Sequence, residues 1–215
     1  MTTSNVPDDS LEKVAAEARV CTKCDLCKTR IKAVPGEGPA DAEIFFIGEA
    51  PGLNEDRVGR PFVGAAGQFL DELLASASLQ RSACFIGNVV KCRPPDNRNP
   101  TTQEIAACAP YLSRQLALIK PTVVVTLGRF SLEKFIKGEA ISRIHGVLRN
   151  IDGQLVLPMY HPAAALHRAE LRPTVLQDFQ QVPLALAAAR QNSATLPPTE
   201  TTLQVDEPPQ QMKLF

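Results

Sequence analysis

The sequence predicts an α/β protein of three layers (α/β/α), in which helices flank a short central parallel sheet of about four strands. Two observations predict it: four short apolar runs are typical of buried strands, and helical patterns separate them along the chain. Strands that alternate with helices indicate βαβ crossovers and hence a parallel sheet. With 215 residues and 44% hydrophobic content, the chain is long enough to bury one sizeable core.

The predicted strands are bounded by glycine, proline or polar residues. They cover residues 43–47 (EIFFI), 84–90 (CFIGNVV), 122–127 (TVVVTL) and 154–159 (QLVLPM). The predicted helices have apolar residues at the spacing of one helix face, and they cover residues 9–20, 65–79, 102–119, 129–137 and 174–190. Open α/β sheets bind ligands beyond the carboxyl ends of their strands, so we expect a site there.

The composition changes near the C-terminus. From about Gln191 the chain is rich in proline, threonine and glutamine and has no helical periodicity. Such a segment buries too little apolar surface to offset the entropy of ordering it. We therefore expect a folded domain over residues 1–190 and a disordered tail over residues 191–215.

Charge and hydropathy limit the classes of function. The chain has 23 basic and 23 acidic residues, and residues 21–190 hold 20 basic and 16 acidic ones, so a nucleic-acid partner would depend on local basic patches. No apolar run reaches the roughly 18 residues of a membrane span, and the N-terminus lacks an apolar signal region. We expect a cytoplasmic protein, a monomer without membrane contact.

Six cysteines occur in this chain without a secretory signal, which argues against a disulfide framework. Cys21 and Cys24 form a C-x2-C pair, and Cys92 and Cys108 follow as a C-x15-C pair. Thiolates from two distant segments are typical ligands of zinc or of an iron–sulfur cluster, although buried structural thiols are the alternative. Cys27 has the same spacing from Cys24, so spacing alone leaves the N-terminal pair open.

Polar residues follow the predicted strands at the expected ligand-binding edge. Glu49 and Glu55 lie in GEAPGLNEDR, directly after the first strand, Asn88 lies in the second, and His161 follows the fourth. Taken singly, the acids fit a turn and a helix N-terminus, and the histidine fits a core position. Together they place two carboxylates, an amide and an imidazole at one edge of the sheet.

Five motifs in a fixed order carry a family resemblance. They are the C-x2-C pair, PGEGP at 35–39, GEAPGLNEDRVGRPFVGAAGQFL at 48–70, GNVVKCRPPDNRNP at 87–100 and MYHPAAALHR at 159–168. Over residues 21–182 the chain closely resembles the family 4 uracil-DNA glycosylases, the iron–sulfur members of their superfamily. The resemblance implies an enzyme of base excision repair that hydrolyses the N-glycosidic bond of deoxyuridine in single- or double-stranded DNA, releasing uracil and leaving an abasic site.

The resemblance also implies roles for residues of the uracil pocket. Phe62 would stack on the uracil ring, Asn88 would read its edge, and His161 would donate to the charge that develops at O2. Glu55 would lie near C5 and exclude the thymine methyl, with Gly52 leaving space for it.

The same resemblance places the backbone of Ala50 and the side chain of Glu49 beside the water and the base. The best-known uracil glycosylases have an aspartate at the position of Ala50, so the water-orienting group is not settled by the family. We rank Glu49 above Glu55 for this role, which makes Glu49 and His161 the predicted catalytic pair.

The family's ligand pattern falls on Cys21, Cys24, Cys92 and Cys108 and implies a [4Fe-4S] cluster that braces the loop after Asn88 without a redox part in the reaction. Contacts to DNA are expected from basic residues near the pocket, namely Lys91, Arg93, Arg98 and Arg168. The resemblance thus favours an enzyme associated with the nucleoid.

Two further expectations complete the sequence-based account. The final segment QMKLF resembles the pentapeptide that binds the bacterial sliding clamp, with Gln211 as a polar anchor and Leu214 and Phe215 as apolar contacts. The alternative to an enzyme is a non-catalytic DNA-binding or polymerase-associated module of the same fold, because a fold alone does not fix a function. The joint presence of Phe62, Asn88 and His161 argues against that alternative.

Overall fold

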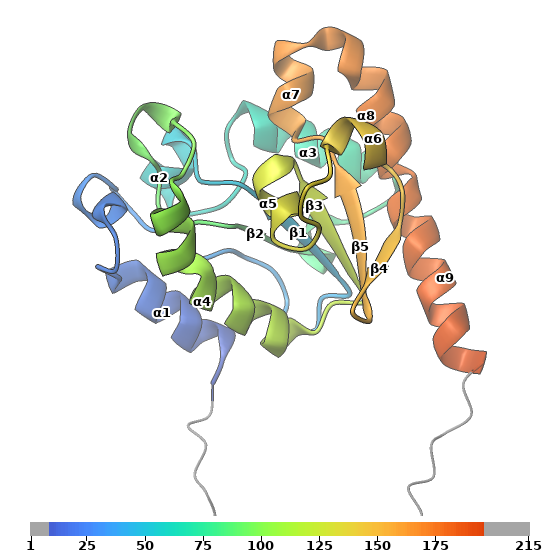
Figure 1. The fold of residues 1–215 in the computed structure, drawn as a ribbon, viewed down its shortest axis with the longest axis horizontal. Coiled ribbons are helices and arrows are strands. Elements are labelled where there is room, and N and C mark those ends of the chain that lie inside the picture. The colour runs from blue at the N-terminus through green and yellow to red at the C-terminus, as the bar shows by residue number, and fades with distance from the viewer. Residues whose placement is uncertain (1–8, 196–215) are drawn as a thin grey trace, which may run out of the picture.

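The computed structural model describes residues 9–195 of the chain, with side chains described as far as Gln191. A five-stranded sheet in the order β2-β1-β3-β5-β4 lies at its centre (Figure 1). Its strands are β1 (Ile44–Gly48), β2 (Phe85–Asn88), β3 (Val123–Leu127), β4 (Arg149–Ile151) and β5 (Gln154–Met159). Strands β2, β1, β3 and β5 are parallel, as predicted.

The fifth strand, β4, pairs antiparallel with β5 at the edge of the sheet and was not predicted. It has three residues, none of them buried, so it lacks the apolar pattern of the other strands. A tight turn joins the two strands, with Asp152 and Gly153 both at positive φ (49° and 88°). This Asp-Gly pair is the sequence signal of a hairpin that the prediction missed.

Helices cover both faces of the sheet, which confirms the α/β/α prediction. One face, with Phe46 and Val125, packs against α3, α8 and α9, and the other, with Phe45 and Val124, packs against α1 and α4. Neighbouring residues of a strand point to opposite faces, so each apolar strand serves both cores. The helices are α1 (Leu11–Val20), α2 (Leu53–Val58), α3 (Ala65–Ser76), α4 (Thr102–Ile119), α5 (Arg129–Glu133), α6 (Ile141–Ile144), α7 (Pro162–His167), α8 (Arg172–Phe179) and α9 (Gln181–Thr195).

The helix predicted over residues 174–190 is instead two helices, α8 and α9. The break fits Pro183, because a proline ring clashes with the carbonyl four residues earlier in a continuous helix, here that of Phe179. Helix α9 extends to Thr195, past Gln191, where the tail was expected to begin, and the division of the chain into a domain and a tail stays a prediction. Gln211, Leu214 and Phe215, the predicted clamp contacts, lie outside the described residues. Within residues 9–195, no helix combines the length and the apolar character needed to cross a membrane.

The register of the sheet brings the ends of the parallel strands together. Gly48 of β1 pairs with Asn88 of β2, and Leu127 of β3 pairs with Met159 of β5. The connection that leaves β1 runs to β2, on one side of the sheet, whereas the connection that leaves β3 runs to β4 and β5, on the other side. These two connections therefore diverge between the neighbouring strands β1 and β3. Such a divergence opens a crevice at the carboxyl edge, where ligands of α/β proteins bind.

Candidate functional site: a pocket at the carboxyl edge of the sheet

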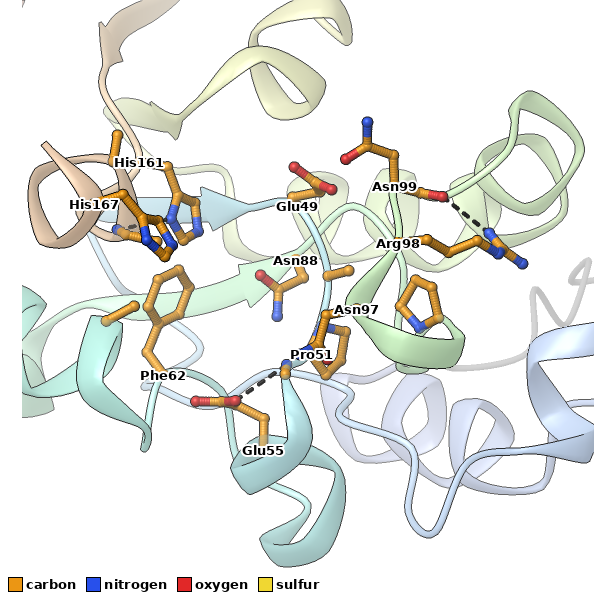
Figure 2. Close-up of a pocket in the computed structure, with 16 residues that line it drawn as sticks. Glu49, Pro51, Glu55, Phe62, Asn88, Asn97, Arg98, Asn99, His161 and His167 are labelled. Atoms are coloured by element: carbon orange, nitrogen blue, oxygen red, sulfur yellow. Dashed lines mark hydrogen bonds between the residues drawn. The ribbon is translucent and has the colours of Figure 1, made fainter.

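A cavity of about 540 Å³ opens at this edge (Figure 2). It gathers all seven predicted pocket residues, which come from the loops after β1 and β5, from the end of β2, from α2 and from the segment between α2 and α3. Its lining consists of Glu49, Ala50, Pro51, Gly52, Glu55, Phe62, Ala66, Asn88, Pro94, Asn97, Arg98, Asn99, His161, Ala163, Ala164 and His167. The volume lies in the usual range of small-molecule binding pockets.

Asn88 lies at the centre of the pocket with its side-chain amide directed into it (Figure 2). The residue is 1% exposed, and its Oδ1 accepts no hydrogen bond from the protein. A buried polar atom without a partner costs free energy, and a ligand with a matching N–H would remove that cost. Gly48 makes the position possible, since a Cβ there would lie 2.4 Å from Asn88 Oδ1.

Phe62 forms one wall of the pocket, in an unusual backbone conformation. Its φ is 51°, the left-handed region that non-glycine residues seldom adopt. Its ring lies against that of His161, with centroids 5.6 Å apart and an interplanar angle of 27°. Gly67 of α3 allows this arrangement, because a Cβ at that position would lie 2.0 Å from the Phe62 carbonyl oxygen. Strained backbone of this kind collects at functional sites, where the surrounding structure must hold it.

Arg81 holds the backbone of Phe62 from outside the pocket. Its guanidinium donates to the carbonyl oxygens of Pro61 (2.6 Å) and Phe62 (3.2 Å). The same group is paired with Glu37 and Asp71, each at 2.9 Å. The planar fork of an arginine suits several acceptors at once, so Arg81 fixes the position of two successive peptide units.

Replacing Arg81 by glutamine should lower the free energy of unfolding by about 1–3 kcal/mol, because two carbonyl groups lose a charged donor. Arg60→Gln is the matched control, since Arg60 also binds Glu37 (2.7 Å) but is largely exposed and contacts neither carbonyl. We expect the control to cost less than about 1 kcal/mol. Urea unfolding of both variants measures the difference. Equal losses of unfolding free energy would contradict the role of Arg81 in holding the Phe62 backbone.

His161 begins α7 and presents a defined tautomer to the pocket. The backbone N–H of Ala163 donates to His161 Nδ1 at 3.1 Å, so the ring proton resides on Nε2. Burial lowers the pKa of this imidazole to about 4, although the charge of Glu55 opposes the shift. At neutral pH the ring is therefore uncharged and can donate through Nε2–H.

Glu49 follows β1 and lies across the pocket from Phe62 (Figure 2). Burial raises the pKa of its carboxyl above the ordinary value, and the positive charge of Arg129 partly offsets this effect. A carboxylate whose basicity is increased by burial is suited to accept a proton from water. Arg129, at the start of α5, was not predicted, because an arginine after the Gly128 turn carries no distinctive signal.

Glu55 joins two loops through hydrogen bonds from their backbone N–H groups. Its Oε1 accepts from the backbone N–H groups of Val63 (2.8 Å) and Gly64 (2.7 Å), and its Oε2 accepts from that of Gly52 (3.1 Å). A Cβ at Gly52 would lie 2.7 Å from Oε2, so the glycine leaves space for the carboxylate. With three N–H donors already bound, Glu55 is better placed to hold the pocket wall than to act on water. The proposed exclusion of the thymine methyl by Glu55 stays a prediction.

Five cysteines line a second, small cavity between α1, α4 and the loop after β2. Cys21, Cys24, Cys92 and Cys108 meet there, as predicted, and Cys27 lines it too. Cys84 lies apart, directly before β2, where burial raises the pKa of its thiol to about 11. Within residues 9–195, no three cysteine, histidine or acidic side chains are spaced to hold a single metal ion.

The surroundings of these sulfurs suit thiolate ligands. Cys92 Sγ accepts from Arg30 Nη1 (3.1 Å), and Cys108 Sγ accepts from the backbone N–H of Lys91 (3.2 Å). Burial raises the pKa of Cys108 to about 11, so without a metal this thiol keeps its proton. N–H donors at the sulfurs stabilise the negative charge of a metal–thiolate group. The donor set therefore fits a sulfur-ligated cofactor, and Cys27 remains an alternative fourth ligand.

Comparison with known proteins identifies the family. The sequence model described as the uracil DNA glycosylase superfamily matches residues 35–182. The chain belongs to this superfamily. The Type-4 uracil-DNA glycosylase of Saccharolobus solfataricus is 48% identical over 190 residues, which cover 84% of this chain and 88% of the relative. Proteins of the same printed name from Sulfurisphaera tokodaii (48% over 184 residues; 81% and 84% covered) and Archaeoglobus fulgidus (46% over 183; 81% and 92% covered) are also similar.

The prediction that Lys91 contacts DNA is wrong. Lys91 is 1% exposed, and its ammonium donates to the carbonyl oxygen of Asn88 (2.9 Å) and to Gln115 Oε1 (2.7 Å). Burial lowers its pKa to about 8. A side chain enclosed in this way cannot reach a phosphate, so Lys91 belongs to the interior of the protein.

The other three predicted DNA contacts, Arg93, Arg98 and Arg168, differ in their hydrogen-bond partners and in their exposure. Arg98 lines the pocket, but its guanidinium makes a two-point pair with Glu104 (2.7 and 2.9 Å) that braces the loop against α4. Arg93 Nε donates to Asn97 Oδ1 at 2.7 Å. Arg168 is exposed and directly follows α7, next in sequence to His167, which lines the pocket. Arg168 is therefore the best placed of the three for a phosphate, and the DNA-binding roles stay predictions.

Proposed function

We propose that this protein removes uracil from DNA by hydrolysing the N-glycosidic bond of deoxyuridine, as its membership of the superfamily and the printed names of its relatives support. The observation that carries the proposal is the buried amide of Asn88, whose Oδ1 lacks a partner and which shares one cavity with Phe62 and His161. A pocket that contacts a base on its face and on its edge requires the nucleotide to be flipped out of the stack.

The proposed roles follow from the chemistry of the bond. Cleavage between C1′ of the sugar and N1 of uracil leaves the electron pair on the base, so negative charge develops at O2. His161 Nε2–H donates to that oxygen, and a neutral donor does so without placing a charge in a buried site before the reaction. Asn88 accepts from N3–H through Oδ1 and donates to O4 through Nδ2, which cytosine cannot match. Phe62 stacks on the ring.

Water completes the reaction at the sugar. The water oxygen bonds to C1′ of the oxocarbenium-like sugar, and one of its protons passes to the carboxylate of Glu49. Glu49 then gives this proton to the departing uracil anion, which leaves as neutral uracil. The raised basicity of the buried Glu49 carboxyl supports this role. Glu55, already bound to three N–H groups, holds the loops that carry Phe62 and Gly52.

Incubation with an oligonucleotide that carries one deoxyuridine, followed by alkali, tests the proposal. The wild-type protein should produce a strand break at the deoxyuridine and none in a matched oligonucleotide with thymidine. Binding of both without a break would instead favour the non-catalytic DNA-binding module.

We also propose that Cys21, Cys24, Cys92 and Cys108 hold a [4Fe-4S] cluster, which would supply a structural brace for the loop after β2. The aerobically or anaerobically purified protein should be brown, with broad absorbance near 400 nm and about four irons per chain, as four-cysteine ligation of such a cluster implies. Cys84→Ala is the control and should keep the iron, since Cys84 lies outside the cysteine cavity. A colourless anaerobic preparation with stoichiometric zinc would overturn this assignment.

The remaining proposals concern the state and location of the enzyme. We propose that it is a cytoplasmic, nucleoid-associated monomer that is recruited to replicating DNA. We propose that Gln211, Leu214 and Phe215 bind a sliding clamp, since a short apolar segment on a tether raises the local concentration of enzyme at replicating DNA. A peptide of residues 204–215 should bind the purified clamp with micromolar affinity, and Leu214→Ala with Phe215→Ala should abolish binding. Absence of wild-type peptide binding at high micromolar concentration would remove the proposal.

A further inference from the structure

Lys91 is a buried cation with neutral hydrogen-bond partners. Its ammonium donates to a backbone carbonyl, that of Asn88, and to a side-chain amide oxygen, that of Gln115. Taking an ammonium group out of water is costly, and a carboxylate is the usual compensation. A lysine at this position therefore carries a desolvation cost, and its placement between Asn88 and Cys108 is the observation to explain.

The contact with Asn88 fixes the residue that points into the pocket. Asn88 is held by the sheet, since it pairs with Gly48 and the N–H of the next residue, Val89, donates to the Gly48 carbonyl at 3.0 Å. The carbonyl of the same peptide unit, that of Asn88, accepts from Lys91 Nζ at 2.9 Å, three residues further along the chain. The direction of the Asn88 amide follows from these two constraints on its backbone.

Helix α4 anchors Lys91 through one face. Glu104, Cys108 and Gln115 are spaced by four and seven residues, which places them along one stripe of an α-helix. Glu104 binds Arg98, Cys108 Sγ accepts from the Lys91 N–H, and Gln115 accepts from the Lys91 ammonium. Gln115 is itself fixed by its donation to the Pro35 carbonyl at 2.8 Å. Both ends of Lys91 are thus tied to the helix that supplies one wall of the cysteine cavity.

We propose that Lys91 is a positioning residue that orients Asn88 for reading uracil and links this amide to the cysteine cavity through α4. The inference rests on the proposed function. Without the ammonium, the Asn88 carbonyl and Gln115 Oε1 lose their donor, and the peptide after Asn88 is held only through its N–H, that of Val89. A small rotation there displaces the amide from the edge of the base, which a buried polar contact does not tolerate.

A double-mutant cycle tests the proposal. Lys91→Met keeps the length of the side chain and removes its donors, and Lys13→Met makes the same change at an exposed position of α1. With a deoxyuridine oligonucleotide, Lys91→Met should lower the single-turnover rate about tenfold or more, while iron content and the Lys13→Met rate match those of the wild type. In an Asn88→Ala background, Lys91→Met should change the remaining rate less than about twofold, because its effect passes through the Asn88 amide.

Two results would overturn the proposal: a wild-type rate for Lys91→Met, or a full tenfold loss in the Asn88→Ala background. If Lys91→Met does not fold, Gln115→Leu, which removes only one acceptor, replaces it and should show a smaller loss that again disappears with Asn88→Ala. A persistent loss there would also overturn the proposal. Failure of the wild-type protein to release uracil would count against the proposed function, whereas an active wild type with either contrary result counts against Lys91 alone.

Discussion

His161→Ala should lower the single-turnover rate of uracil release by about 100- to 1,000-fold, the usual cost of losing one donor to developing charge. The reason lies in the tautomer: Nδ1 is occupied by the Ala163 N–H, so Nε2–H is the donor that remains for uracil O2. Charge at O2 is larger in the transition state than in the bound substrate, so affinity for DNA should change little. Single-turnover kinetics and a binding titration separate the two effects.

The pH dependence gives a second check on His161. The imidazole with a pKa of about 4 is neutral above that value and gains a proton only below it. The wild-type rate should therefore show no change from imidazole protonation between pH 5.5 and 8.

His161→Gln, which keeps an N–H donor, should retain more activity than His161→Ala. A His161→Ala protein with the wild-type rate would contradict the leaving-group role.

Asn88→Asp should reverse part of the selectivity of the pocket. The carboxylate has no donor for uracil O4, so we expect uracil release to slow by about 100-fold or more, while the amino group of cytosine finds an acceptor. Discrimination against cytosine should therefore relax, although cytosine removal need not become fast. Paired single-turnover rates with deoxyuridine and deoxycytidine oligonucleotides measure the ratio.

The control for this variant is Asn150→Asp. Asn150 lies in the hairpin of β4 and β5, where its Oδ1 accepts from the Gly153 N–H, an interaction that aspartate keeps. It should leave both rates unchanged. An unaltered uracil-to-cytosine ratio in Asn88→Asp would show that the amide does not read the base.

The central architecture could be predicted from the sequence because its determinants are local. Apolar runs such as EIFFI have the length and composition of buried strands, and their alternation with helices predicts parallel pairing. Strand β4 was missed since an edge strand with no buried residue has no such run, and the division between α8 and α9 depended on a single proline.

The pocket could be predicted in outline but not in its supports. Loops after parallel strands meet at one edge, so Glu49, Asn88 and His161 were expected together and do line one cavity. Lys91 was taken for a phosphate ligand because it shares the loop after Asn88 with Arg93 and Arg98, and nothing near it in the sequence reveals Gln115 as its partner 24 residues later. Arg81 was missed for the same reason, since Glu37, its ion-pair partner, lies 44 residues earlier.

The most direct test of the pocket is the crystal structure of the His161→Ala protein with an oligonucleotide that carries one deoxyuridine. We expect the uracil to be flipped into the cavity at the carboxyl edge of the sheet, with its ring on Phe62, its N3 and O4 on the Asn88 amide, and Glu49 on the side of C1′. A uracil that stays stacked in the DNA, or that occupies another site while this cavity holds only water, would contradict the proposed function of the pocket.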